Sequence, residues 1–124
     1  MLGSADIIGF VPVADCDPAR AFYEGVLGLR FLKDDGFAVV MDAHGITLRL
    51  VKVQAVTPAQ HTILGWQVKG IESVVQRLQA KGVQFVRYGF FKQDDLGIWT
   101  APNGDKIAWL KDPDGNTLSV SEHI

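Results

Sequence analysis

Residues 7–31 read IIGFVPVADCDPARAFYEGVLGLRF, and this stretch predicts a strand followed by a helix. The apolar run at 7–13 has the length of a strand. Asp17 and Pro18 match the N-cap and the first position of a helix over 17–27, which Gly28 ends. Apolar side chains spaced i, i+3, i+4 and i+7 give this helix one buried face: Ala19, Phe22, Tyr23 and Val26.

The pattern returns in the second half of the chain, 54 residues further along (82 − 28 for the two helix-ending glycines). A strand is predicted at 62–68, and a second stripe of apolar residues indicates a helix that ends at Gly82: Ile71, Val74, Val75 and Leu78. GLRF at 28–31 and GVQF at 82–85 hold the same place in the two copies. Further strands are predicted at 37–42, 45–53, 97–101, 106–111 and 117–122. The sequence therefore predicts an α+β fold of two β-α-β-β-β modules, at about 5–53 and 61–123, joined by a linker at 54–60.

Composition narrows the class of protein. A chain of 124 residues with 48% hydrophobic content suits one domain. The formal net charge of −2 and the absence of a basic run argue against nucleic acid and membrane partners. MLGSADIIGF has no basic region before a long apolar stretch, so no secretory signal is predicted. The single cysteine, Cys16, is compatible with a reducing compartment, and we expect a cytoplasmic protein.

Two stretches carry a family resemblance. FVPVADCDPARAFYEGVLGLRF at 10–31 and GDKIAWLKDPDGNTLSV at 104–120 resemble the vicinal oxygen chelate superfamily, which includes glyoxalase I, antibiotic-resistance proteins of the bleomycin and fosfomycin types, and extradiol dioxygenases. The resemblance implies one pseudo-symmetric domain with a curved mixed sheet. Helices cover its convex side and a ligand lies on its concave side. It also implies a homodimer.

The resemblance further implies where a metal would bind. Metal-dependent members take His or Gln from the first strand of each module and Glu from the last strand. Here those positions hold Ile8, Ile63, Arg49 and Ser119. Isoleucine offers no lone pair, and a permanent guanidinium charge repels a divalent ion. The prediction is a protein without a metal or another cofactor.

Alternation along the strands assigns side chains to two faces. The predicted concave face holds eleven residues: Ile8, Phe10, Thr47, Arg49, Val51, Ile63, Gly65, Gln67, Thr117, Ser119 and Ser121. The predicted convex face is apolar and should pack under the helices: Ile7, Val11, Leu48, Leu50, Leu64, Trp66, Val68, Leu118 and Val120. Apolar walls with a few polar groups are typical of a small-molecule site. We expect ligand contacts from Phe10, Arg49, Gln67, Phe90, Trp99, Ser119 and Ser121.

Several of these residues have a second interpretation. Arg49 either binds an anionic group of the ligand or forms a structural ion pair. The aromatic residues of YGFFKQDDLGIW at 88–99 form either a lid over a planar ligand or part of a core or dimer interface. Asp6 and His61, two residues before the vacant positions, offer a shifted metal site helped by Glu122 or His123, although residues so near a chain end are usually solvated. Asp94 and Asp95 are expected in a solvated turn. Cys16, beside a helix start that favours a thiolate, is expected to be structural.

Three classes of function follow from these expectations. The first is a metal-free protein that sequesters or senses a small organic ligand, as bleomycin-resistance proteins do. The second is a glyoxalase-like lyase or a dioxygenase with a non-standard metal site, and the third is an interaction module with a vestigial cleft. The four side chains at the metal positions favour the first. The sequence shows no His or buried carboxylate pair placed for acid–base catalysis, so enzyme activity is left open.

Overall fold

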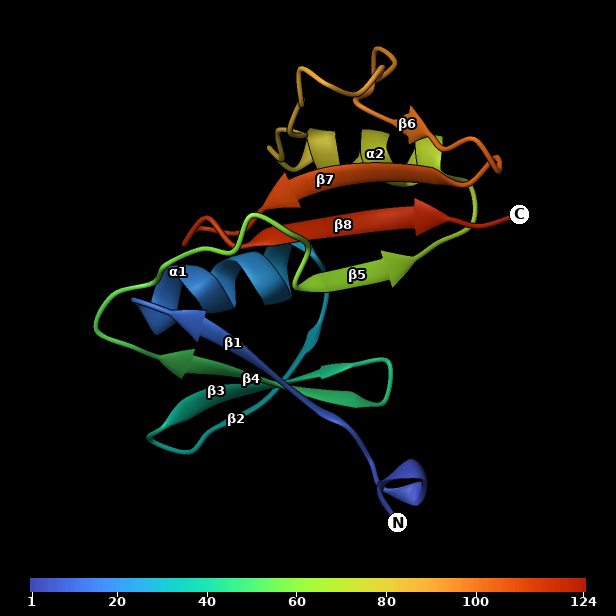
Figure 1. Ribbon diagram of the computed structural model, residues 1–124. Helices are drawn as coiled ribbons and strands as arrows, with labels where there is room; N and C mark the ends of the chain where they lie inside the picture. The colour runs from blue at the N-terminus through green and yellow to red at the C-terminus, as the bar shows by residue number, and fades with distance from the viewer. The chain divides into compact units, whose positions relative to one another are not determined.

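A computed structural model describes all residues, 1–124, and divides them into two compact units, Met1–Thr57 and Pro58–Ile124 (Figure 1). The boundary between the units falls inside the predicted linker at 54–60. That the two units together make one domain stays a prediction. None of the helices has both the length and the apolar composition needed to span a bilayer.

The first unit is a four-stranded sheet with one helical segment. Its strands are β1 (Ile8–Val13), β2 (Arg30–Asp34), β3 (Ala38–Ala43) and β4 (Ile46–Lys52), in the order β1-β4-β3-β2. β1 runs parallel to β4, and the other pairs are antiparallel. A 3-10 turn, η1 (Leu2–Ser4), precedes β1, and the helical segment between β1 and β2 comprises α1 (Cys16–Arg20) and a π-helical stretch, η2 (Ala21–Val26).

The second unit repeats this topology. Its strands are β5 (Leu64–Gln67), β6 (Trp99–Thr100), β7 (Lys106–Lys111) and β8 (Thr117–Glu122), in the order β5-β8-β7-β6, with β5 parallel to β8. Helix α2 (Ile71–Ala80) follows β5 and lies against one face of the sheet (Figure 1). The predicted double β-α-β-β-β pattern is therefore confirmed, as two four-stranded mixed sheets, one in each unit.

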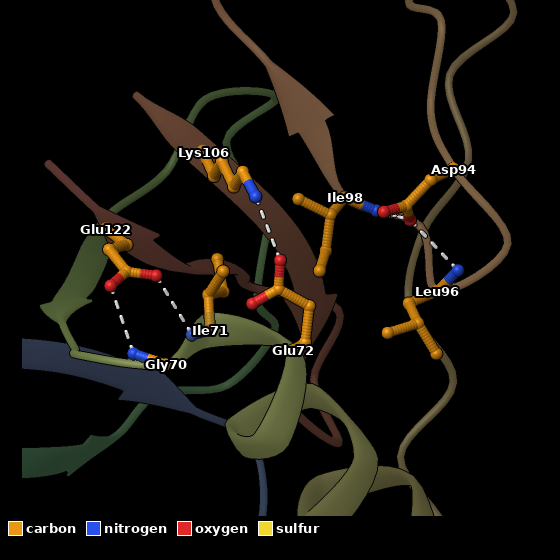
Figure 2. Close-up of polar contacts among 8 residues, drawn as sticks. All are labelled: Gly70, Ile71, Glu72, Asp94, Leu96, Ile98, Lys106 and Glu122. Atoms are coloured by element: carbon orange, nitrogen blue, oxygen red, sulfur yellow. Dashed lines mark hydrogen bonds and ion pairs between the residues drawn. The ribbon is translucent and has the colours of Figure 1, made fainter. Parts of the chain in front are cut away.

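The two helical segments begin in different ways. In the first unit Asp15 is the N-cap and its carboxylate accepts a hydrogen bond from the Asp17 N–H, so the predicted cap at Asp17 is wrong by two residues. Pro18 consequently lies inside the first turn, where its missing N–H costs no helical hydrogen bond. In the second unit the cap is distant in sequence, because the Glu122 carboxylate accepts from the N–H groups of Gly70 and Ile71 (Figure 2).

Alternate residues of the strands pack toward the helices. In the first unit β1 and β4 bury Val11, Val13, Leu48 and Leu50. In the second unit α2 and the sheet share a cluster of Ile71, Val75, Ile98, Ala108 and Val120, flanked by Trp66 and Val68. These residues follow the predicted convex pattern, with one correction. Ile7 precedes β1 and is 69% exposed, so it does not pack under a helix.

The turn DPDGN between β7 and β8 is a buried polar network. The Asp112 carboxylate accepts from the backbone N–H groups of Asp114 and Asn116, and from the Asn116 side-chain amide at 2.9 Å. Asp112 and Asn116 are almost fully buried, so these bonds satisfy groups that would otherwise be costly to desolvate. Gly115 has φ +84°, a conformation that a glycine adopts without strain.

The second copy departs from the first between its helix and its sheet. In the first unit Arg30 and Phe31 of GLRF begin β2, but GVQF at 82–85 forms no strand. Residues 81–98 instead form a long connection before the two-residue strand β6. Val86 donates its N–H to the Trp109 carbonyl, so part of this connection runs beside β7. The extra chain length supplies the aromatic loop described below.

Candidate functional site

In the first unit, the positions that hold metal ligands in the family's metal enzymes cannot bind one. Ile8 pairs with Thr47 and Phe10 pairs with Arg49, so these four side chains share the face that points away from the helix. Ile8 and Phe10 are 50% and 65% exposed. These four side chains offer a metal ion two apolar groups, one hydroxyl and one cation.

Arg49 forms an ion pair within its own unit. Its guanidinium donates to the Asp35 carboxylate at 2.7 Å, and the two side chains are each about three-quarters buried. Asp35 also accepts from the N–H groups of Phe37 and Ala38, which fixes the turn between β2 and β3. The hydrogen bond from Arg49 is the main cause that lowers the pKa of Asp35 from 3.8 to about 2. Of the two interpretations of Arg49, the structure contains the ion pair; anion binding stays a prediction.

The second unit presents a different set of side chains on the face away from α2. One row crosses the sheet from Trp99 through Ile107 and Ser121 to Gln67, and a parallel row contains Trp109, Ser119 and Gly65. Ala108 and Leu110, between the outward residues of β7, are buried. The predicted contacts Gln67, Trp99, Ser119 and Ser121 are thus brought onto one face.

The polar half of this face centres on Ser119 and Gly65. Ser119 is 8% exposed. A Cβ at Gly65 would lie 3.1 Å from the Ser119 Oγ, so any larger residue there would crowd the hydroxyl. Ile63 precedes β5 and donates its N–H to the Thr117 carbonyl. An isoleucine and a serine hydroxyl at these positions do not make a site for a divalent ion, which needs several anionic or imidazole ligands.

The aromatic half of the face is covered by the loop at 88–91. The Phe91 ring lies 4.4 Å from the Trp99 ring and 5.2 Å from the Trp109 ring, and its plane is within 3° of that of Trp109. Tyr88 packs edge-on against Trp109 at 5.3 Å. Phe90, one of the predicted contacts, packs on Phe91 and is 78% exposed. Trp109 is not among the predicted contacts, although its alternation with the buried Ala108 and Leu110 places it on this face.

Hydrogen bonds fix the base of the aromatic loop. Arg87 donates to the carbonyls of Asp94 and Asp95, and the Gln93 amide donates to the carbonyls of Val86 and Gly97. The Asp94 carboxylate accepts from the N–H groups of Leu96 and Ile98 (Figure 2). Asp94 therefore organises a turn, as expected, and is not one half of an acid pair with Asp95.

A chain of side-chain hydrogen bonds links Ser121, His123 and Asp105. The His123 Nε2 lies 2.9 Å from the Ser121 Oγ, and its Nδ1 lies 2.8 Å from the Asp105 carboxylate. The bond with His123 is the main cause that lowers the pKa of Asp105. An ionised carboxylate only accepts, so Nδ1 carries a hydrogen and, in a neutral ring, Nε2 accepts from the serine hydroxyl. The expectation that His123 is merely solvated near the chain end is wrong.

The remaining candidates do not assemble into a site. Asp6 and His61 are exposed and belong to different units. Glu122, which could have helped a shifted metal site, caps α2 instead. No three His, Cys, Asp or Glu side chains are grouped so as to hold a metal ion. Burial, followed by the charge of Asp34, raises the pKa of the Cys16 thiol, so the helix start does not produce a thiolate.

These features define a protein with two β-α-β-β-β units whose second sheet carries an aromatic and hydroxyl-bearing face. The sequence model that defines the Glyoxalase/Bleomycin resistance protein/Dioxygenase superfamily matches residues 6–120. The chain belongs to this superfamily, which confirms the resemblance seen in the sequence. Among curated protein sequences, none is significantly similar to the chain.

Solved structures share the fold at low sequence identity. A superfamily member from Sphaerobacter thermophilus superposes with a TM-score of 0.76 at 21% identity, covering 97% of this chain and 98% of that one. TnmS3, an antibiotic-binding protein from Streptomyces, has a TM-score of 0.73 at 23% identity over 98% of this chain and 97% of its own. A lactoylglutathione lyase from Agrobacterium tumefaciens has a TM-score of 0.73 at 22% identity over 96% and 93%. At these identities the likeness concerns the fold alone.

Proposed function

We propose that this chain is a binding protein for a small organic ligand and that it works without a bound metal. The observation that carries the proposal is the outward face of the second sheet, where Ser119 stands at a metal position beside Trp109 and Gly65. Aromatic surface with a few placed hydroxyls is the composition of a site for an organic molecule. Ile8, Ile63 and Arg49 support the absence of a metal, because none of them is a ligand for a divalent ion.

The fold neighbours include both functional classes. TnmS3 is an antibiotic-binding protein, and the Agrobacterium neighbour is a lactoylglutathione lyase. The side chains at the metal positions favour the binding class. In this proposal Arg49 remains a contact for an anionic group of the ligand. Asp35 engages one of its two terminal nitrogens, so other donors of the guanidinium fork stay available.

We also propose that the protein acts as a homodimer in the cytoplasm. β1 is an edge strand of its sheet, and Ile8 and Phe10 give it an exposed apolar surface. An edge strand presents unpaired backbone groups that can pair with another chain. Sedimentation analysis of the purified protein should give twice the 13.6 kDa mass of one chain. A monomer across the micromolar range would contradict the dimer without affecting the ligand proposal.

The test of the binding function combines metal content with thermal melting. Untagged protein is purified without chelators, analysed for metals, and then melted with and without Zn²⁺, Ni²⁺, Mn²⁺ and Fe²⁺. We expect no stoichiometric metal, and no change in melting temperature when the metal ions are added. In a second screen, some members of a panel of organic ligands should raise the melting temperature. A stoichiometric metal would overturn the metal-free proposal in favour of a lyase or dioxygenase. A melting temperature that no ligand of the panel changes would favour an interaction module.

A further inference from the structure

We infer that Trp99 and Trp109 are the floor of a site for a planar, hydroxylated, fused-ring aromatic ligand, and that the Phe91 ring occupies this floor in the free protein. The inference rests on the proposed function and names its ligand class. Three observations carry it: the stacking of Phe91, the contrast between the tip and the base of its loop, and the hydroxyls on the neighbouring strand.

The stacking geometry is that of a flat ring lying on two indoles. Phe91 is nearly parallel to Trp109, at 3°, and is inclined by 29° to Trp99. The two indole centroids are themselves 6.2 Å apart, so one benzene ring lies beside both and cannot cover both completely. A planar ligand of two or three fused rings would make the same kind of contact with each indole over a larger area. Replacing Phe91 by such a ligand therefore exchanges like contacts and adds buried surface.

The loop is built so that its tip can move while its base stays in place. Arg87, Gln93 and Asp94 tie the base with six hydrogen bonds to backbone groups on either side of the tip. Within residues 89–92, the one backbone bond among these turns runs from the Phe91 N–H to the Tyr88 carbonyl at 3.1 Å. A Cβ at Gly89 would meet nothing within 4 Å, and Phe90 is largely exposed. Lifting Phe91 thus requires few bonds to break.

The hydroxyl side chains of β8, next to β7, would bind the polar substituents of the ligand. Ser119 is the register partner of Trp109 on the adjacent strand, about 5 Å away, whereas Ser121 is the partner of Ile107, which lies between it and Trp99. The Ser121 hydroxyl donates to His123 when that ring is neutral, so its oxygen keeps the capacity to accept. It would then accept a hydrogen bond from a ligand hydroxyl. Gln67, exposed beyond Ser121, adds a donor and an acceptor.

Alizarin, a three-ring dihydroxy aromatic, is a suitable probe, with binding followed by tryptophan fluorescence and by equilibrium dialysis. The chain has three tryptophans, of which Trp66 packs beside the α2 cluster and reports background quenching. We expect wild-type protein to bind alizarin. Phe91→Ala should bind it about two- to tenfold more tightly, because the competing ring is removed. Trp99→Leu and Trp109→Leu should each weaken binding by a similar factor or more.

Matched controls separate the site from the rest of the surface. Phe37→Ala makes the same substitution at an exposed phenylalanine of the first unit, outside the aromatic face, and should leave affinity unchanged. Anthraquinone keeps the three rings and lacks only the hydroxyls, and it should bind less tightly than alizarin. Melting curves confirm that each variant is folded; if Trp109→Leu is not, Trp99→Leu decides.

Two results would overturn the inference. Weaker binding by Phe91→Ala would make Phe91 a wall of the site and not its occupant. If Phe91→Ala does not bind alizarin, the two tryptophans do not form a site for such a ligand. The same conclusion follows if Trp99→Leu and Trp109→Leu both bind alizarin as tightly as the wild type does. Neither result touches the proposed binding function, which the metal analysis and the wider ligand panel decide separately.

Discussion

The two units have the same strand order but display different chemistry on the face away from the helix. The first unit shows exposed Ile8 and Phe10 beside the Arg49–Asp35 ion pair. The second shows stacked aromatic rings beside Ser119 and Ser121. Because outward residues of a strand take little part in the core under the helix, one scaffold can carry either set. The difference teaches that topology fixes which positions face outward and leaves their chemistry free.

The units also differ in how their helices are anchored. The cap in the first unit is local, from Asp15 to Asp17, whereas the cap in the second unit joins Glu122 on the last strand to Gly70 and Ile71. The second arrangement ties α2 directly to the sheet that carries the candidate site. A substitution that destabilises α2 should therefore also destabilise this sheet.

The largest effect is expected at the core of the second unit. Ile71→Ala should lower the free energy of unfolding by about 2–5 kcal/mol, because the side chain is fully buried in the α2 cluster and its removal leaves a cavity. Urea denaturation measures the change. Ile46→Ala, at a position 45% exposed, is the control and should stay within about 0.5 kcal/mol of the wild type. Equal effects of the two substitutions would contradict the assigned core.

A smaller effect is expected at the local cap of the first unit. Asp15→Ala should cost about 1 kcal/mol, since the Asp17 N–H loses its acceptor. Asp15→Asn should cost much less, because asparagine caps helices about as well as aspartate. Chemical denaturation of the two variants distinguishes them. If Asp17→Ala proves the more damaging substitution, the cap lies where the sequence alone placed it.

Glu122 provides the pH-dependent side of the comparison. The backbone bonds from Gly70 and then Ile71 lower the pKa of Glu122 below its ordinary value of 4.5. A carboxyl whose pKa is lower in the folded state stabilises the fold above its unfolded pKa, and this contribution is lost as the pH falls through the folded pKa. Melting temperature should therefore fall with decreasing pH from about 5 downward, and Glu122→Gln should flatten this dependence. A slope identical to that of the wild type would show that the cap is not charge-dependent.

Much of the fold follows from the sequence because its signals are local. The i, i+3, i+4 and i+7 stripes place both helices, and strand alternation places Ser119, Ser121 and Gln67 on one face. The chain does not need distant contacts to specify these features. The boundaries of β7 and β8 agree with prediction for the same reason, since the DPDGN turn separates them.

What the sequence did not reveal depends on contacts between distant residues. Glu122 lies 52 residues from Gly70, and no local pattern links them. The sequence predicts a solvated end residue at His123, because its partner Asp105 is 18 residues away. Arg49 had two interpretations, and only the position of Asp35, in a turn 14 residues earlier, distinguishes the ion pair. Long-range side-chain pairing, more than secondary structure, is therefore where sequence reasoning stopped.

The Arg49–Asp35 pair should give an acid effect of its own, at a lower pH than Glu122. The pKa of Asp35 is lowered from 3.8 to about 2, and the hydrogen bond from Arg49 is the largest cause. The stabilisation is present above the unfolded value of 3.8 and is lost as the pH falls toward 2. Asp35→Asn should flatten the dependence of the melting temperature on pH, and only in this pH range. Flattening that began near pH 5 would mean that Asp35 is not held by Arg49.

Arg49→Met offers the finest distinction between the two faces, because it separates a structural role from a binding role. The substitution removes the donor that lowers the pKa of Asp35, so it should lower the melting temperature modestly at neutral pH. If the remaining donors of Arg49 bind an anionic group, affinity for the carboxylated member of a matched ligand pair should fall while affinity for the neutral member stays constant. Lys106→Met removes a comparable pair with Glu72 in the second unit and serves as the control. Unchanged affinity for both ligands would leave Arg49 a structural residue, and the binding function would then belong to the aromatic and hydroxyl face of the second sheet.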